Sequence, residues 1–259
     1  MKATIVVYVF PGTNSEDETK RALEDVGFNV RLVRSDDRSS AAKDADGYVL
    51  PGGFAYEDRI RAGAVAAHDR AMDAVIDAAQ RGKPVLGICN GAQVLLEAGL
   101  VPGDGASRRP TAAFAPNTPG GRFRCVHIHM RLSVTPSCSP FFAGLQDGAV
   151  IPAWMAHAEG RLAASFDELG RIEEGRHLAF VYSDAKGEVS EAAIPNGSAL
   201  GAAGLINKSG NVLAIMPHPE RDAWTFMHRY DLIAARDAAE ALRPSGGIRL
   251  FESFAKAFA

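Results

Sequence analysis

The sequence lacks the features that would place it in a membrane or outside the cell. None of its 259 residues belongs to a run of about 18 apolar residues, so we expect no transmembrane helix. The apolar opening, residues 1–10, is short, ends in Pro-Gly and has no small-residue cleavage site, so it predicts a buried strand. Only three cysteines occur, at 89, 125 and 138, without paired spacing, which predicts free thiols in a cytoplasmic protein.

An excess of charge of one sign is also lacking. The 28 Lys and Arg residues nearly balance the 31 Asp and Glu residues, giving a net charge of −3. Because the two signs are interspersed, we expect neither nucleic acid nor an anionic membrane surface as a partner. No Gly-x-x-x-x-Gly-Lys-[Ser/Thr] loop occurs, and no Gly-x-Gly-x-x-Gly follows a predicted strand. We therefore expect no nucleotide cofactor on this chain.

Short apolar runs alternate with helical segments through the first part of the chain. Strands are predicted at residues 3–10, 28–33, 47–50 and 84–88, and helices at 16–26 and 64–80. This alternation predicts an α/β fold with a mostly parallel, doubly wound sheet. With 47% hydrophobic residues the chain can bury one full core, so we expect a single domain over residues 1–259.

The second half of the sequence changes character. Residues 122–134 alternate between apolar and polar, and 205–216 are typical of two strands about a turn at 207–211. These patterns predict antiparallel hairpins added to the parallel core. Residues 102–121 are rich in Gly and Pro and are predicted to form a loop.

One pentapeptide has the layout of a nucleophile elbow. Gly87-Ile88-Cys89-Asn90-Gly91 follows a predicted buried strand and precedes a helical run at 92–98. Backbone N–H groups at a helix N-terminus favour the thiolate, which is the reactive form of cysteine. A small buried cysteine at a strand end is the alternative interpretation, and these five residues alone do not decide between the two.

Two further motifs match a cysteine nucleophile. His218-Pro219-Glu220 follows an apolar strand and offers a general base with a carboxylate to orient it. Gly52-Gly53 also follows a strand, and this pair forms either an ordinary turn or half of an oxyanion hole that the N–H of Asn90 would complete.

At these residues the sequence resembles class I glutamine amidotransferases, and especially the glutaminase components of phosphoribosylformylglycinamidine synthase. The cysteine elbow and His218-Pro-Glu are typical of the whole class. The narrower resemblance rests on Arg61-Ala-Gly-Ala, His157-x-Glu-Gly-Arg and Pro195-Asn-Gly-Ser.

This resemblance implies a class I glutamine amidotransferase fold and a glutaminase that works through a Cys-linked glutamyl thioester. The released ammonia would serve the ATP-dependent amidation of formylglycinamide ribonucleotide in de novo purine biosynthesis. The implied site residues are the catalytic Cys89, His218 and Glu220, the oxyanion-hole residues Gly53 and Asn90, and the glutamine-binding Gln93.

The resemblance also implies partners. L-Glutamine is the expected substrate, and ATP and Mg are expected on a separate synthetase subunit, accompanied by a small third subunit. Possible contacts with the synthetase are Arg61 and a loop carrying His157, Glu159 and Arg161. Residues 222–247 look longer than the usual linker and are interpreted as an insertion or docking segment; its aromatic and histidine side chains are Trp224, Phe226, His228 and Tyr230.

Three alternatives stay open at this point. Cys125, His127 and His129 would share one face of a strand and could bind zinc, although no fourth ligand is evident and no metal site is expected. A small peptidase or glyoxalase on a related sheet would share the elbow without needing His-Pro-Glu. A non-catalytic interaction module would tolerate loss of the thiol or the histidine, and both are present.

Overall fold

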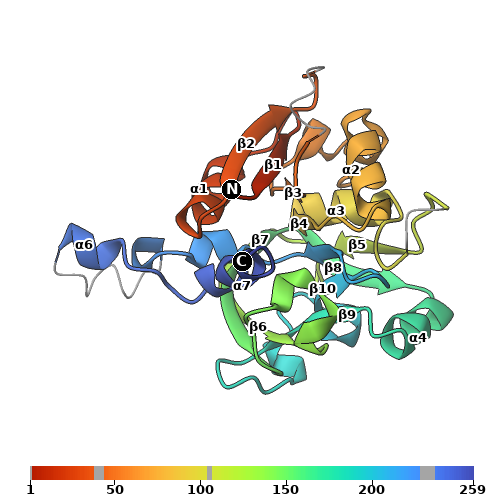
Figure 1. Cartoon of the computed structure of the whole chain (residues 1–259). Coiled ribbons are helices and arrows are strands. Elements are labelled where there is room, and N and C mark those ends of the chain that lie inside the picture. Colours follow the sequence, from red (N-terminus) through yellow and green to blue (C-terminus); the bar gives the residue numbers. More distant parts are fainter. Residues whose placement is uncertain (1, 38–43, 104–106, 228–236) are drawn as a thin grey trace.

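The computed structural model describes residues 2–37, 44–103, 107–227 and 237–259 (Figure 1). Strands and helices alternate in the first half, as the sequence predicts. The first-half elements are β1 (Thr4–Val9), α1 (Glu16–Asp25), β2 (Asn29–Arg34), β3 (Gly47–Leu50), α2 (Ala71–Gln80), β4 (Val85–Ile88), α3 (Asn90–Glu97) and β5 (Ala112–Pro116). They are followed by β6 (Arg124–Leu132), β7 (Val150–His157), β8 (Glu159–Ala164), α4 (Phe166–Glu174), β9 (Leu178–Ser183), β10 (Ala202–Ile206), β11 (Val212–Ile215), α6 (Ala238–Ala241) and α7 (Ile248–Lys256).

Nine of the eleven described strands form one large sheet with a parallel and an antiparallel half. Its nine strands run in the order β2-β1-β3-β4-β11-β10-β9-β6-β7. Neighbours from β2 to β11 pair in parallel, and those from β11 to β7 pair in antiparallel fashion. The predicted α/β fold, with a parallel core and added antiparallel hairpins, is therefore confirmed.

Helices cover the parallel half on both faces (Figure 1). Helix α1 packs against β1 and β2 and touches α7, whereas α2 and α3 pack against β4 from the other side. Every residue of α3 is buried, which is unusual for a helix and places it in the core of the molecule. Because α3 begins directly after β4, its N-terminus is fixed relative to the end of that strand.

The antiparallel half curls back toward the parallel half. Although β7 is the last strand of the sheet, Trp154 within it forms an isolated antiparallel bridge with His218, just after β11. The N–H of His218 donates to the Trp154 carbonyl at 2.7 Å, and the Trp154 N–H donates to the His218 carbonyl at 3.2 Å. The last strand of the sheet therefore reaches the end of the central strand β11, at the residue that sequence analysis assigns as general base.

Two local predictions are wrong. The helix expected at 64–80 starts only at Ala71, after a short 3₁₀ turn at Ala66–His68, because the carboxylate of Asp69 accepts the Ala71 N–H at 2.8 Å and starts a new helix. The loop expected at 102–121 contains β5, which pairs with β8 in a small second sheet. Residues 112–116 become a strand because they pair with the distant strand β8; their own sequence does not alternate between apolar and polar residues.

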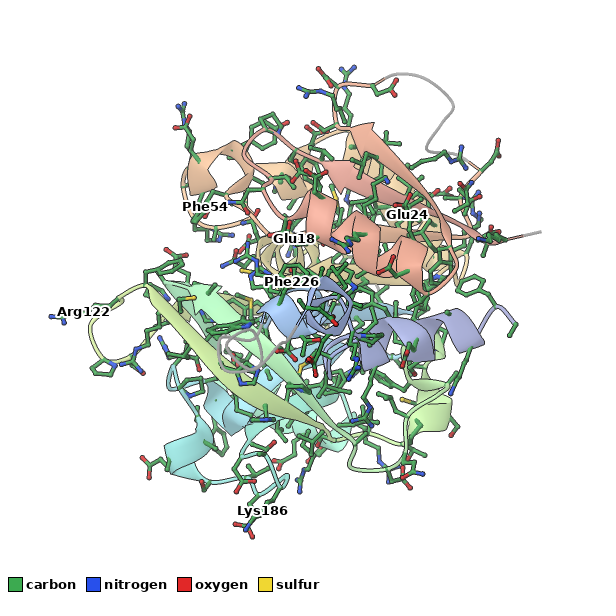
Figure 2. All side chains as sticks on the ribbon, turned by 90° about the vertical axis from the view of Figure 1, so that its left-hand side faces the viewer. Glu18, Glu24, Phe54, Arg122, Lys186 and Phe226 are labelled. Carbon is green, nitrogen blue, oxygen red and sulfur yellow. The ribbon has the colours of Figure 1, made fainter. Side chains whose placement is uncertain are left out.

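The segment from 222 onward is anchored to α1. Trp224 is buried, its indole N–H donates to the Asp25 carboxylate at 2.9 Å, and the Arg21 guanidinium lies 4.5 Å from the centre of its ring. Phe226 stacks on Trp224 beside α1 (Figure 2). Helix α6 projects away from the body of the molecule (Figure 1). Two of the side chains that the sequence analysis names in segment 222–247, His228 and Tyr230, lie outside the described residues. A docking role for the segment stays a prediction.

Within the described ranges, no helix has the length and the apolar character needed to cross a membrane.

Candidate active site

Three neighbouring parallel strands bring the predicted motifs together. Gly52-Gly53 follows β3, Cys89 follows β4 and His218 lies just beyond β11. These strands are adjacent in the sheet and run in the same direction, so their carboxyl ends meet at one edge. This edge is where open α/β sheets bind ligands.

Cys89 occupies a strained turn between β4 and α3. Its φ of +51° and ψ of −107° are unusual for a residue with a side chain, and such conformations persist only where the surrounding structure holds them. The thiol is 6% exposed, and Sγ donates to the Ala156 carbonyl across 3.9 Å. The turn matches the predicted nucleophile elbow, with the thiol at the helix N-terminus.

His218 and Glu220 form a buried pair. Nδ1 of His218 lies 2.5 Å from Oε1 of Glu220, and neither residue is more than 2% exposed. Burial acts to lower the pKa of His218, but the Glu220 carboxylate and Cys89 outweigh it and raise that pKa to about 10. The ring is therefore protonated at neutral pH and has a proton to donate.

The N–H groups of Gly53 and Asn90 stay the predicted donors to an oxyanion, and the surroundings of each are as follows. Gly53 faces Thr13 in an antiparallel bridge whose hydrogen bonds run from Phe54 N–H to the Gly12 carbonyl and from Asn14 N–H to the Gly52 carbonyl. In such a pair the N–H of Gly53 itself points away from Thr13. Its φ of +151° and a position for Cβ only 2.7 Å from the Gly12 oxygen restrict this residue to glycine.

The second predicted donor is the N–H of Asn90, which starts α3 and so has no intrahelical acceptor. The Asn90 side chain holds the loop after β3 by two hydrogen bonds: its Oδ1 accepts the Ala55 N–H, and its Nδ2 donates to Asp58 at 2.9 Å. Nδ2 also donates to Gln93 Oε1 at 3.0 Å. The Gln93 amide in turn donates to the Glu159 carbonyl at 2.8 Å. This network connects the nucleophile's helix to two cavity walls.

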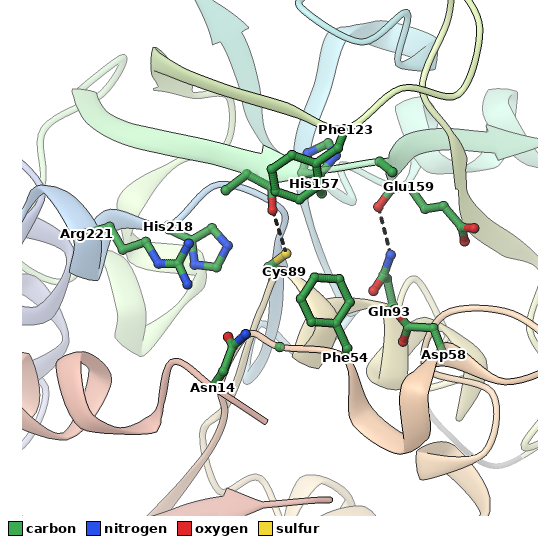
Figure 3. A pocket seen from close by; sticks show the side chains of 13 residues that line it. Asn14, Phe54, Asp58, Cys89, Gln93, Phe123, His157, Glu159, His218 and Arg221 are labelled. Carbon is green, nitrogen blue, oxygen red and sulfur yellow. Dashed lines mark hydrogen bonds between the residues drawn. The ribbon is translucent and has the colours of Figure 1, made fainter. Parts of the chain in front are cut away.

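A cavity of about 250 Å³ opens in front of Cys89. That volume lies below the ~300–1,000 Å³ typical of sites for drug-sized ligands, so it suits a small metabolite. His218 and Arg221 lie on one side of Cys89, and Asp58, Gln93 and Glu159 lie on the other (Figure 3). The lining residues are Asn14, Gly53, Phe54, Asp58, Cys89, Gln93, Phe123, Ala156, His157, Ala158, Glu159, His218 and Arg221.

The expected placement of three partner-contact residues in a loop is wrong. His157 is the last residue of β7, Glu159 begins β8 and Arg161 lies within β8. His157 is 4% exposed and belongs to the cavity wall. Burial and the nearby charge of His218 lower the pKa of His157 to about 3, so its ring is neutral.

The fourth predicted contact, Arg61, is half-exposed beside the site. Its guanidinium makes two hydrogen bonds to the buried Glu97 carboxylate, one of them 2.6 Å long from Nε to Oε1, and Glu97 raises the pKa of Arg61. Arg61 also lines a second cavity that shares Gln93 and Glu159 with the first. A contact with a partner stays a prediction for this residue.

Sequence reasoning missed the link between the N-terminal loop and the site. Ser15 stands at the start of α1, but its hydroxyl makes no capping bond and instead accepts from Arg221 Nη2 at 2.7 Å. The N–H groups of Asn14 and Ser15 both donate to the Gly52 carbonyl. Arg221 follows Glu220 directly, and this adjacency is the one signal in the sequence that could have drawn attention to it.

The zinc alternative finds no support in the described part of the chain. No group of three or more His, Cys, Asp or Glu side chains there could hold a metal ion. His127 lies 3.1 Å from the buried Asp222 carboxylate, and Cys125 is exposed.

The comparisons with known proteins agree with this geometry. The model of the CobB/CobQ-like glutamine amidotransferase domain matches residues 2–257. The phosphoribosylformylglycinamidine synthase subunit PurQ of Pyrococcus furiosus is 42% identical over 225 residues, which cover 87% of this chain and 92% of that protein. The chain belongs to the PurQ family of glutamine amidotransferases. Its relative of the same description in Moorella thermoacetica is 43% identical over 218 residues, 84% of this chain and 86% of the relative.

Solved structures resemble this amidotransferase over its full length. The structure of PurLQS from Thermotoga maritima superposes with a TM-score of 0.76 at 30% identity and covers 100% of both chains. The glutaminase domain of Trypanosoma brucei CTPS, 14% identical with a TM-score of 0.51 over 99% of this chain and 93% of that one, shares the fold.

Proposed function

We propose that this amidotransferase is the glutaminase subunit of phosphoribosylformylglycinamidine synthase. Its task is to release ammonia from L-glutamine for the ATP-dependent amidation of formylglycinamide ribonucleotide. The observation that carries the proposal is the arrangement of Cys89, His218 and Glu220 at the ends of adjacent strands, in front of a cavity of metabolite size. The PurQ relatives support the choice of substrate and pathway.

The geometry supports a two-step hydrolysis. The Cys89 thiolate attacks the side-chain carbonyl carbon of glutamine, and the N–H groups of Gly53 and Asn90 bind the oxygen as it becomes negative. The C–N bond then breaks while His218 donates its proton to the departing ammonia, leaving a glutamyl thioester. His218 next accepts a proton from a water that attacks the thioester; the C–S bond then breaks, which releases glutamate and restores the Cys89 thiolate. Glu220 orients the ring and stabilises its charge throughout.

The reaction makes sense only beside a synthetase, because ammonia released into neutral water is mostly protonated and no longer nucleophilic. We place ATP and Mg on that synthetase subunit, with a small third subunit in the complex, and we expect the complex in the cytoplasm. The structure of PurLQS supports such an assembly.

The docking face that we propose surrounds the mouth of the cavity. Phe54 and Phe123 line the cavity and are 51% and 55% exposed, and Ile60, which lines another surface cavity together with Arg61, is 89% exposed. Phe54 and the loop that carries Arg122 lie on the same side of the molecule (Figure 2). Contiguous exposed apolar groups often mark an interface with another protein. Arg61 and Arg161 stay candidate contacts at its edge.

Substitution of the nucleophile tests the proposal. In the complex with the synthetase, Cys89→Ala should lower glutamine-dependent synthesis by at least ~10³-fold while ammonia-dependent synthesis persists. Cys125→Ala, at an exposed thiol, serves as the matched control and should leave both activities near those of the wild type. Equal loss of the two activities in Cys89→Ala would show that this cysteine is structural.

A further inference from the structure

We propose that Arg221 is a positioning residue for the predicted oxyanion hole. It holds the Ser15 hydroxyl, and Ser15 in turn holds the peptide group between Gly52 and Gly53, whose N–H is expected to bind the oxygen that becomes negative. This inference rests on the proposed glutaminase function and adds the residues that orient one of its donors.

The peptide group between Gly52 and Gly53 is held by its carbonyl. The Gly52 oxygen accepts the N–H of Asn14 at 3.1 Å and that of Ser15 at 3.2 Å. The carbonyl and the N–H of a planar trans peptide point in opposite directions, so fixing the Gly52 oxygen also fixes the Gly53 N–H. Gly53 lines the cavity in front of Cys89. A rotation of this peptide would therefore turn the N–H away from the oxygen that it is expected to bind.

Arg221 fixes the side chain of Ser15. Its Nη2 donates to Ser15 Oγ at 2.7 Å, and its Nε donates to the Glu18 carboxylate at 3.3 Å. Ser15 is buried, and its hydroxyl also donates to Asn14 Oδ1 at 3.3 Å. A charged donor makes a stronger hydrogen bond than a neutral one. Arg221 and Asn14 both line the cavity (Figure 3), and Arg221 follows Glu220 directly in the chain, so the segment that carries the base is tied to the strand that carries the donor.

Ser15 stands at the N-terminus of α1 without capping it. Ser15-Glu-Asp-Glu18 has the pattern of a capping box, in which the serine hydroxyl accepts a helix N–H and the glutamate side chain reaches back to the serine N–H. Here the hydroxyl makes no capping bond, the serine N–H donates to Gly52, and the glutamate pairs with Arg221. Loss of a cap destabilises a helix, and such departures from local rules are typical of functional sites.

The contact continues along one face of α1. Side chains three or four positions apart lie on the same side of a helix. Four side chains with this spacing contact Arg221 or Trp224: Ser15, Glu18, Arg21 and Asp25. The helix is therefore fixed along its length to the segment that follows the catalytic base, and its N-terminal loop has a set position relative to that segment.

Kinetic measurements on the complex with the synthetase test the assignment. Ser15→Ala removes the hydroxyl that Arg221 holds, keeps the backbone N–H that binds Gly52, and alters no residue that lines the cavity. We expect kcat for glutamine hydrolysis to fall about tenfold or more and KM to change less than twofold, because the donor acts mainly when the oxygen becomes negative.

An aldehyde analogue of the substrate, glutamate γ-semialdehyde, measures the donor directly. Its carbonyl carbon forms a C–S bond with the Cys89 thiolate, and the C=O electron pair moves to the oxygen, which then occupies the position of the oxyanion. Ser15→Ala should raise the Ki of this aldehyde about tenfold or more, equivalent to about 1.4 kcal/mol. In the Cys89→Ala background, where no adduct forms, adding Ser15→Ala should raise the Kd of L-glutamine less than twofold.

A double variant tests whether Arg221 acts through Ser15. Arg221→Gln alone should raise the Ki of the aldehyde as Ser15→Ala does, and the double variant should raise it by less than a further twofold, because both changes remove one hydrogen bond. Ser253→Ala on α7 is the matched control. Its hydroxyl is likewise buried and accepts the Gly144 N–H at 2.9 Å, and its loss should leave the Ki unchanged.

An unchanged Ki in Ser15→Ala would overturn the assignment, and so would an equal rise in the Ki of the aldehyde and the Kd of L-glutamine. Full additivity in the double variant, or a similar rise of the Ki in Ser253→Ala, would overturn it as well. Absence of glutamine hydrolysis by the wild-type complex would instead overturn the proposed function, and this inference with it.

Discussion

Gly52→Ala should disable the site through one methyl group. A Cβ at this position would lie 2.6 Å from Cε1 of His218 and 3.4 Å from Cβ of Cys89. Carbon atoms pack at about 3.5–4.0 Å, so the imidazole must move by roughly 1 Å. The ring cannot move freely, because Glu220 holds Nδ1 at 2.5 Å. A misplacement of about 1 Å costs about 10²-fold in rate, so we expect kcat/KM for glutamine to fall by about that factor.

The assay is steady-state glutamate release by the reconstituted complex, with ammonia-dependent synthesis followed in parallel. Gly52 does not have a φ in the left-handed region, so the backbone accepts alanine, and the free energy of unfolding should fall only by the ~1–3 kcal/mol typical of overpacking. Gly170→Ala on α4 is the matched control, because a Cβ there meets no atom within 4 Å. Glutaminase activity equal to that of the wild type in Gly52→Ala would refute the reasoning. So would a loss of activity that is fully explained by the fraction of unfolded protein.

Three further outcomes are expected. The pKa of His218 is about 10 in the folded chain against 6.5 as the ordinary value, so its charge adds stability that is fully present below about pH 6.5 and is lost as the pH rises through 10. In denaturant titrations the stability advantage of the wild type over Glu220→Gln should therefore shrink across that range; a constant difference would contradict the pairing. An electrophilic glutamine analogue should label Cys89, which is buried in the cavity, and a bulky maleimide should label the two exposed cysteines instead; mass spectrometry showing even labelling by both reagents would speak against a shaped site. Trp224→Ala should lower the free energy of unfolding by about 3–5 kcal/mol, whereas Leu242→Ala, at a half-exposed residue, should change it by less than about 0.5 kcal/mol; similar losses would show that the indole does not anchor the segment.

The parts of the fold that local pattern determines could be predicted. Buried parallel strands are nearly continuous apolar runs, so β1, β3 and β4 stand out, and the glycines around Cys89 mark the turn between strand and helix. Because the motifs follow strands of one parallel sheet, their meeting at a common edge also follows from sequence and geometry.

The features that depend on tertiary contacts could not be predicted. Nothing local indicates that the antiparallel half curls back until β7 meets His218, so His157 was expected in a loop and lies in the cavity wall. Two other features are likewise contacts between distant residues: the pairing of β5 with β8, and the hydrogen bond that Arg221 donates to the Ser15 hydroxyl.

The position of β11 has a consequence for the chain as it leaves the ribosome. This strand lies between β4 and β10, so it joins the parallel half of the sheet to the antiparallel half, although it is the last of all the described strands to be synthesised. Until it is inserted, Cys89 stands at the exposed edge of an unfinished sheet, and His218 has not yet been made. A nascent chain, or a fragment that ends before His218, therefore carries the thiol without its base. We expect no hydrolysis of glutamine until the whole protein has folded.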